Sequence, residues 1–196
     1  MSGIAFFDFD GTITTKDSLA EFIRLRHGGA GFITGLIPLI PYIVGYKAGF
    51  MDRQVAKEKL LSAFFGGIDE REFISSSNQF VEQHIPKLLR PGAVDKLNWH
   101  KEQGHQIVIV SASPTYWLEP WCRQQGFGCI ATTLEVAGGK ITGRIKGLNC
   151  HGEEKVRLIR DHYQLENYAE IFAYGDTSGD KPMLALANYP FYKPFR

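Results

Sequence analysis

Two aspartates one residue apart, Asp8 and Asp10, come directly after the apolar run 4–7 and before Gly11. Carboxylates this close raise each other's pKa unless a cation lies between them. A short apolar run that ends in a glycine turn is typical of a buried parallel strand, whose carboxyl end is where α/β proteins bind ligands. The pair therefore predicts a Mg²⁺ site with one carboxylate free to act as a nucleophile.

Two more polar clusters follow apolar runs. Ser111 closes the run 106–110, and a hydroxyl with backbone N–H groups at a helix start favours an anion such as phosphate. The same pattern also fits a simple helix N-cap. Asp176 and Asp180 follow the run 171–174, four residues apart across small turn residues. Asp180 also suits a cap, whereas Asp176 has no equally good structural role.

The elements that must position these clusters alternate along the chain as in an α/β fold. A capping-box pattern from Ser18 to Glu21 predicts a helix that runs to about Gly28. Further helices are expected over 54–65, 70–84, 93–103, 116–125, 153–163 and 182–187, and strands over 4–7, 106–110 and 171–174. Gly138 and Gly139 predict a hairpin that joins 130–136 to 140–145. Residues 90–92 are expected to be a turn where the chain returns from an inserted domain.

Composition indicates an ordinary soluble protein. The chain has 196 residues, 44% of them hydrophobic, which is enough for one large domain or a core with an insertion. Its net charge of +1 gives no reason to expect a nucleic-acid partner. Three cysteines without a C-x-x-C pair are expected to be free thiols in a reducing cytosol. We expect no signal peptide, because the first strand begins at about residue 4.

One long uncharged segment needs a separate explanation. Residues 28–46 contain no charged side chain, and 32–46 approach the roughly 20 apolar residues of a membrane span. Pro38 and Pro41 interrupt the run. A single crossing would separate Asp8 from every later motif, which excludes spanning if the motifs share one site. The segment is expected either to pack inside its own domain or to lie on a membrane surface.

In chain order, the DxDGT motif at 8–12, the strand ending in Ser111, the helix lysine Lys155 and the GDxxxD motif at 175–180 form a four-part signature. This signature resembles the haloacid-dehalogenase-like (HAD) phosphohydrolase superfamily over essentially the whole chain. The GGKITG hairpin at 138–143 and the helical insertion after the first motif make it similar to the branch that contains phosphoserine phosphatase. Taken alone, Lys155 would more often be a solvated helix lysine.

The resemblance implies an α/β fold, with a Rossmann-like parallel sheet core and an inserted helical cap domain. Residues 1–15 and 91–196 would form the core, and residues 16–90 the cap. Closure of such a cap excludes water and completes the pocket.

The resemblance also implies roles for the acidic residues. Asp8 would attack phosphorus and form an aspartyl-phosphate. Asp10 would protonate the leaving alkoxide and then deprotonate the hydrolytic water. Mg²⁺ would be held by the carboxylates of Asp8 and Asp176 and by the backbone carbonyl of Asp10. Thr12 would either brace Asp10 or only stabilise the turn.

Further residues would bind the substrate or support the site. Ser111, Lys155 and the backbone N–H of Ala112 would hold the phosphoryl oxygens, and such charge stabilisation supplies most of the catalysis in phosphoryl transfer. Asp180 would orient the metal waters or Lys155 from behind. Asp17 stands where phosphoserine phosphatases use a glutamate to bind the substrate amine. It would either play that part with a shorter reach or only favour the start of the next helix.

Asp10 favours hydrolysis of a phosphate ester, because a halide leaving group needs no proton and an alkoxide does. A phosphatase is therefore expected ahead of a phosphotransferase. A non-catalytic phosphate-binding or membrane-peripheral module stays an alternative, against which the intact set Asp8, Asp10, Ser111, Lys155 and Asp176 speaks.

The substrate would be either a small soluble phosphomonoester or a lipid phosphate. The apolar, proline-broken segment 32–46 is similar to that of the C-type phosphatases that act on phosphatidylglycerophosphate. A lipid substrate would bring this segment against the inner face of the membrane, and a soluble substrate would leave the protein cytoplasmic. The oligomeric state cannot be predicted from these patterns.

Overall fold

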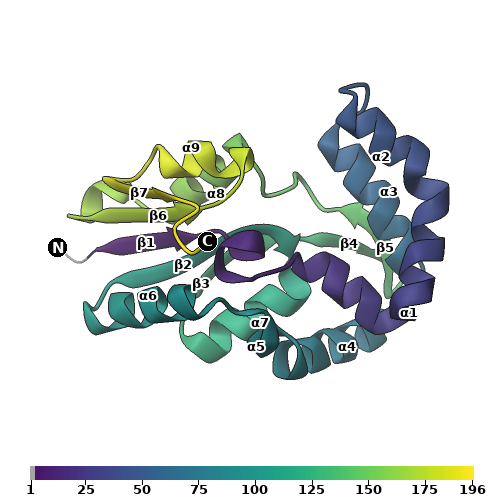
Figure 1. The fold of residues 1–196 in the computed structure, drawn as a ribbon, viewed down its shortest axis with the longest axis horizontal. Helices are drawn as coiled ribbons and strands as arrows, with labels where there is room; N and C mark the ends of the chain where they lie inside the picture. The colour runs from purple at the N-terminus through teal and green to yellow at the C-terminus, as the bar shows by residue number, and fades with distance from the viewer. Residues whose placement is uncertain (1–2) are drawn as a thin grey trace.

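A single parallel sheet forms the centre of the molecule in a computed structural model that describes residues 3–196. Its strands lie in the order β3-β2-β1-β6-β7, and every neighbouring pair is parallel (Figure 1). The strands are β1 (Ile4–Phe7), β2 (Gln106–Pro114), β3 (Gly128–Thr132), β6 (Ile171–Gly175) and β7 (Tyr189–Tyr192). The predicted α/β class with a Rossmann-like parallel core is confirmed.

Both faces of the sheet are covered, which is why its central strands are apolar throughout. Alternate residues of β1 enter different hydrophobic clusters, Ala5 and Phe7 on one face and Ile4 and Phe6 on the other. Helices α6 (Pro91–Glu102) and α7 (Thr115–Gln125) cover the first face, and α8 (Glu153–His162) and α9 (Lys181–Leu184) the second (Figure 1).

Two expectations about elements are corrected, and one strand was missed. The run expected as one strand over 130–136 is divided, because β3 joins the main sheet while β4 (Leu134–Ala137) pairs antiparallel with β5 (Lys140–Ile145). Residues 90–92 are not a free turn, since Pro91 begins α6 at a position where its missing N–H costs nothing. Strand β7 at the edge of the sheet was not predicted.

Residues 18–88 form a helical part beside the sheet, on the right in Figure 1. Its elements are α1 (Ser18–Leu36), a 3₁₀ turn (Ile37–Leu39), α2 (Ile40–Lys47), α3 (Arg53–Phe65), α4 (Glu70–Gln83) and α5 (Ile85–Leu88). The β4–β5 hairpin joins these helices, because the N–H of Ile141 donates to the carbonyl of Ile68 (2.9 Å) and its own carbonyl accepts from Gly67 (2.8 Å). The hairpin therefore lies with the segment 16–90 in space, although it is outside it in sequence.

The start of α1 differs from the capping-box prediction. Asp17, not Ser18, is the N-cap residue, and its carboxylate accepts from the N–H of Ala20 (2.8 Å). The hydroxyl of Ser18 instead lies 3.1 Å from that of Ser113 in the core. The helix was predicted to end at about Gly28; the φ of 70° at this residue kinks it there, but α1 resumes and ends at Leu36.

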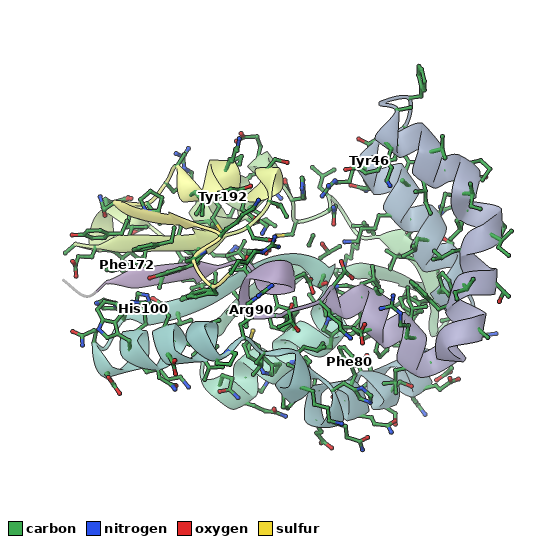
Figure 2. The ribbon with its side chains drawn as sticks, viewed as in Figure 1. Tyr46, Phe80, Arg90, His100, Phe172 and Tyr192 are labelled. Atoms are coloured by element: carbon green, nitrogen blue, oxygen red, sulfur yellow. The ribbon has the colours of Figure 1, made fainter. Side chains whose placement is uncertain are left out.

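The chain enters and leaves the helical part at the same place. The N–H of Thr15 donates to the carbonyl of Leu88 (2.7 Å), and the N–H of Arg90 donates to that of Ile13 (2.8 Å). Arg90, labelled near the centre of Figure 2, also donates from Nε to the carbonyl of Thr14 (3.0 Å). This short crossing fixes the helical part against the carboxyl ends of β1 and β2, where the polar clusters lie.

Candidate active site

Three aspartates from distant parts of the sequence converge at the carboxyl edge of the sheet. Asp8 follows β1, while Asp176 and Asp180 follow β6, and all three are buried. One carboxylate oxygen from each lies within 4.8 Å of the others. Oxygen ligands of this kind are those that Mg²⁺ prefers. The structure thus brings together the two carboxylates that were expected to hold the metal.

Lys155 reaches this cluster from the first turn of α8 and is 1% exposed. Its Nζ donates to Asp8 Oδ1 (2.7 Å), Asp180 Oδ1 (2.7 Å) and the carbonyl of Val110 (2.8 Å), so all three protons are used. Burial by itself would lower the pKa of Lys155, but the two carboxylates outweigh it and hold this pKa above its usual value. The alternative of a solvated helix lysine is wrong.

Asp180 is committed to protein donors on both oxygens. Besides Lys155 on Oδ1, its Oδ2 accepts from the N–H of Thr177 (2.9 Å), the Thr177 hydroxyl (2.8 Å) and the N–H of Asp176 (3.1 Å). Burial opposes ionisation, yet Lys155 and these donors lower the pKa of Asp180. These contacts fit a residue that holds Lys155 in place and closes the capping box of the turn 177–180 better than they fit a metal ligand, and Asp180 makes no side-chain cap to α9 (Lys181–Leu184).

Burial opposes ionisation of Asp8 more than the nearby positive charge of Lys155 favours it. Burial raises its pKa to about 7, even though Lys155 lowers it in part. The three carboxylates of the cluster face two cationic side chains, Lys155 and Arg196, and Arg196 Nη2 contacts Asp176 Oδ2. Because carboxylates outnumber cations here, the donor set fits a divalent cation, which would favour the ionised form of Asp8.

Thr12 contacts Asp8 and Asp176, so the expectation that it braces Asp10 is wrong. Its Oγ1 lies 3.1 Å from Asp8 Oδ2 and 3.3 Å from Asp176 Oδ1. The tight turn 9–13 points Thr12 inward, and its Gly11 has a φ of 81°. A Cβ at Gly11 would come within 2.7 Å of Asp176 Oδ2, so this position requires glycine.

Asp10 is held by two donors that were not predicted from the sequence. The hydroxyl of Ser113 donates to its Oδ2 (2.5 Å), and the N–H of Ser18 donates to its Oδ1 (2.6 Å). Burial, with a smaller contribution from the charge of Asp17, raises the pKa of Asp10 to about 6. A carboxyl group with a pKa near working pH can both give and take a proton. Ser113 lies two residues after Ser111 at the end of β2, and this spacing was the feature of the sequence that could have indicated its role.

The predicted phosphate-binding residues lie beside these carboxylates. Ser111 is buried at the end of β2, and its Oγ accepts from the N–H of Ser113 (3.0 Å). The carbonyl of Ala112 accepts from Nζ of Lys57 on α3. The role of the Ala112 N–H as a phosphate donor stays a prediction.

A cavity of about 400 Å³ opens above the strand ends, between the core and α2 and α3. It is lined by Asp8, Asp10, Asp17, Leu19, Tyr46, Arg53, Ala56, Lys57, Ser111, Ala112, Ser113, Asn149, His151, Lys155, Thr177 and Asp180. Asp17 lies at an exposed position of the lining while serving as the N-cap of α1. Its predicted role in binding substrate stays open.

Lys57 and Asn149 are components of the site that the sequence analysis missed. Lys57 Nζ donates to Asn149 Oδ1 (2.7 Å), and the N–H of Asn149 donates to Gln54 Oε1 on α3 (3.1 Å). Burial lowers the pKa of Lys57 to about 8. Neither residue belongs to a motif, and only the packing of α3 over the strand ends brings them together.

Comparison with known proteins shows which family and which relatives this chain is similar to. The model of the haloacid dehalogenase-like hydrolases matches residues 5–185. Protein CicA of Caulobacter vibrioides is 36% identical over 194 residues, which cover 97% of this chain and 85% of CicA. A Mycobacterium tuberculosis protein named a probable phosphatase is 31% identical over 194 residues, covering 94% of this chain and 66% of that protein.

Solved structures with the same fold include proteins of low sequence identity. A Bordetella pertussis protein of unknown function matches with a TM-score of 0.77 and 27% identity, covering 95% of this chain and 87% of that one. A substrate-bound phosphoserine phosphatase matches with a TM-score of 0.69 and 17% identity, covering 95% of this chain and 83% of that one. At that identity, the second likeness supports the fold alone.

Proposed function

The chain belongs to the haloacid dehalogenase-like hydrolase family, and we propose that it is a phosphatase that hydrolyses phosphomonoesters through an aspartyl-phosphate at Asp8. The observation that carries this proposal is the buried contact of Lys155 with Asp8 and Asp180, next to the cavity and close to a separately held Asp10. These contacts support Asp8 as the nucleophile, and the raised pKa of Asp10 supports it as the group that gives and takes the proton.

The donor set at the strand ends fits Mg²⁺. Asp8 and Asp176 would hold the ion through their carboxylates, and Asp10 through its backbone carbonyl. Bound there, Mg²⁺ would neutralise part of the charge on the phosphoryl group and on the carboxylates. Asp180 would not bind the ion directly, since both of its oxygens already accept from protein groups.

In the first step a carboxylate oxygen of Asp8 forms a bond to phosphorus, and the bond from phosphorus to the ester oxygen breaks. Asp10 gives its proton to the departing alkoxide. In the second step Asp10 takes a proton from water, whose oxygen attacks phosphorus, so that inorganic phosphate leaves and Asp8 is restored. Ser111, Lys155 and the Ala112 N–H would hold the phosphoryl oxygens in both steps.

The substrate is a small soluble phosphomonoester or a lipid phosphate. The cavity of about 400 Å³ accommodates a small leaving group or the head of a larger one. Its wall on the helical side carries Arg53 and Lys57, and Asp17 lies on the same lining. A lipid substrate would place the protein at the inner face of the membrane, and a soluble one in the cytoplasm.

Phosphate release tests the proposal. The panel contains phosphoserine, sugar phosphates, nucleoside monophosphates and phosphatidylglycerophosphate in detergent, each with Mg²⁺ and with a chelator. We expect Mg²⁺-dependent release that is lost in Asp8→Asn and kept in Asp161→Asn, an exposed aspartate on α8. Absence of release from every substrate would favour the non-catalytic alternative, and transfer of phosphate to an added alcohol would favour a phosphotransferase.

A further inference from the structure

A continuous apolar stripe covers the outer side of α1 and α2. Ile33, Ile37, Ile40 and Val44 are 65%, 59%, 52% and 58% exposed. Their spacing of four, three and four residues places them on one side of the helical run. Phe50, in the turn between α2 and α3, is 90% exposed. We call these five residues the α1–α2 face.

The opposite side of the same run packs on the protein. Phe32, Leu36, Tyr42 and Ile43 lie against the main hydrophobic cluster, and Leu39 is part of it. The run Ser18–Lys47 is long and apolar enough to cross a membrane, yet only 6% of its most apolar 18-residue window is buried. Packing therefore explains its inner side and leaves the α1–α2 face without a partner among the described residues.

Crossing a bilayer is excluded by the active site itself. Asp8 precedes the run and Lys155 follows it, and their side chains are 2.7 Å apart. Both ends of the run are therefore on the same side of any membrane. An apolar helix face of this kind can only lie along a surface.

The charges around the α1–α2 face indicate which surface. From residue 22 to residue 51 there is no acidic residue, and the charged side chains are Arg24, Arg26 and Lys47. Arg24 and Arg26 pair with Glu21 and Glu72, so Lys47 is the cation of this stretch that no salt bridge neutralises among the described residues. Arg53 and Lys59 add two exposed cations from α3, whose acidic Asp52 caps its start. An apolar face with basic neighbours complements an anionic lipid surface.

A second copy of the chain fits this face less well. A two-fold interface would bring the same patch of both copies together, so that basic residues would meet basic residues. In an anionic bilayer, Phe50 and Val44 would insert among the acyl chains, and Lys47 would contact the negatively charged head groups. We propose that the α1–α2 face docks the protein on the surface of an anionic membrane.

Docking in this orientation brings the cavity close to the lipid head groups. Tyr46, labelled on α2 in Figure 2, lines the cavity together with Arg53, whose Nε donates to the Tyr46 hydroxyl (2.8 Å). In sequence, Tyr46 lies between Val44 and Lys47, and Arg53 is three residues after Phe50. The docking itself does not depend on the proposed reaction; only its use in reaching a substrate at the membrane rests on the proposed function.

Vesicle co-sedimentation tests the docking. The full chain is mixed with vesicles of equal parts phosphatidylcholine and phosphatidylglycerol, and separately with phosphatidylcholine alone. We expect binding to the anionic vesicles that weakens with added salt and is at least tenfold tighter than binding to neutral ones. Val44→Glu and Phe50→Glu should each weaken the binding at least tenfold, and Lys47→Glu severalfold.

Matched variants elsewhere on the surface serve as controls. Ile74→Glu places the same charge on an exposed apolar residue of α4, and Lys87→Glu reverses an exposed lysine of α5. Both should bind like the unmodified protein. Circular dichroism and release of phosphate from a soluble ester should be unchanged in all five variants, which separates lost docking from lost folding or lost catalysis.

Three results would overturn the proposal. They are no binding to anionic vesicles, binding that Val44→Glu and Phe50→Glu leave unchanged, and a dimer in solution that Val44→Glu converts to monomer. The last result would assign the face to a second copy of the chain. None of the three bears on the proposed phosphatase reaction, which the panel of substrates tests separately.

Discussion

At the scale of single residues, the site depends on how each carboxylate is held. The sequence predicted which aspartates meet, because DxDGT and GDxxxD end neighbouring strands. It did not predict that Ser113 and Ser18 donate to Asp10. In sequence, a serine that caps a helix cannot be told from one that hydrogen-bonds to a catalytic carboxylate. The role of Thr12 was misassigned for a similar reason: spacing does not tell which way a turn residue points.

In the first step, Asp10 is expected to act on the leaving group. Asp10→Asn should lower kcat/KM, which reports the steps up to formation of the aspartyl-phosphate, by a factor of about 10²–10⁴ for an alkyl phosphate, whose alkoxide must be protonated. The loss should be much smaller for p-nitrophenyl phosphate, because its phenolate leaves without a proton. Steady-state kinetics on both esters measure the difference. An equal loss on the two would contradict the role of Asp10 as the acid.

His100, which does not line the cavity, is expected to make the free energy of unfolding depend on pH. It is fully buried between His105 Nδ1 (2.8 Å) and the Tyr174 hydroxyl (3.0 Å), and burial lowers its pKa to about 3. The unfolded chain has an ordinary histidine pKa of roughly 6.5, so between these values it binds more protons than the folded protein. The contribution of His100 to the free energy of unfolding should therefore fall as the pH decreases from about 6.5 towards 3, while the raised pKa values of Asp8 and Asp10 act in the opposite direction.

Urea unfolding at several pH values checks this dependence. Relative to the unmodified protein, His100→Gln, which cannot ionise but can hydrogen-bond, should lose less free energy of unfolding between pH 7 and pH 5. The contribution of His151, whose pKa burial lowers to about 4, should remain in both proteins. His162→Gln, at an exposed position of α8, should leave the slope unchanged. If His100→Gln does not alter how steeply the free energy of unfolding changes with pH, the role given to His100 is contradicted.

At the scale of elements, the β4–β5 hairpin is the most instructive case. Its turn at Gly138 and Gly139 was predicted correctly, because two consecutive positive φ values favour glycine. Its strand before the turn was merged with β3, since alternating apolar residues do not reveal which sheet a strand joins. The contact of β5 with α3 is likewise a property of packing that no local pattern specifies.

Gly143 tests this contact of β5 with α3. Its φ is 81°, and a Cβ there would overlap the backbone of Ser62 on α3. Gly139 has a similar φ of 74° but open space around it. Gly143→Ala should therefore lower the free energy of unfolding by about 1–3 kcal/mol more than Gly139→Ala does, because only the first adds a clash. Chemical denaturation measures both, and equal losses would show that the hairpin does not pack tightly on α3.

At the scale of the whole molecule, motif order along the chain predicted the parallel sheet, the helical insertion and the edge at which the site lies. The predicted division into core and cap stays a proposal. What could not be predicted are the contacts from other parts of the fold, such as Lys57 of α3 in the cavity lining and the contact of Arg196 with Asp176. These residues reach the site only through tertiary packing. The exposure of the apolar face on α1 and α2 also required the structure, since an uncharged run in the sequence favours burial inside the domain.

Metal binding is a whole-molecule property because the ligands come from separate segments. An ion that binds only the folded protein stabilises it by about 2.7 kcal/mol at a concentration 100 times its Kd. Mg²⁺ should therefore raise the Tm of the protein, and Asp176→Asn should remove most of the increase. Asp161→Asn is the surface control, measured by thermal unfolding with and without chelator. An increase that persists in Asp176→Asn would place the ion elsewhere.

The most direct measurement is to identify the covalent phosphoryl group on Asp8. Asp10→Asn protein is mixed with p-nitrophenyl phosphate, whose leaving group needs no proton, and with Mg²⁺, then quenched in acid within the first turnover, digested and analysed by mass spectrometry. The account predicts phosphorylation of the peptide that contains Asp8, because the attack by Asp8 proceeds while the hydrolysis that Asp10 assists is slow. Phosphate release by the unmodified protein without any phosphorylation of Asp8 in either form, or with the phosphoryl group on another residue, would contradict it.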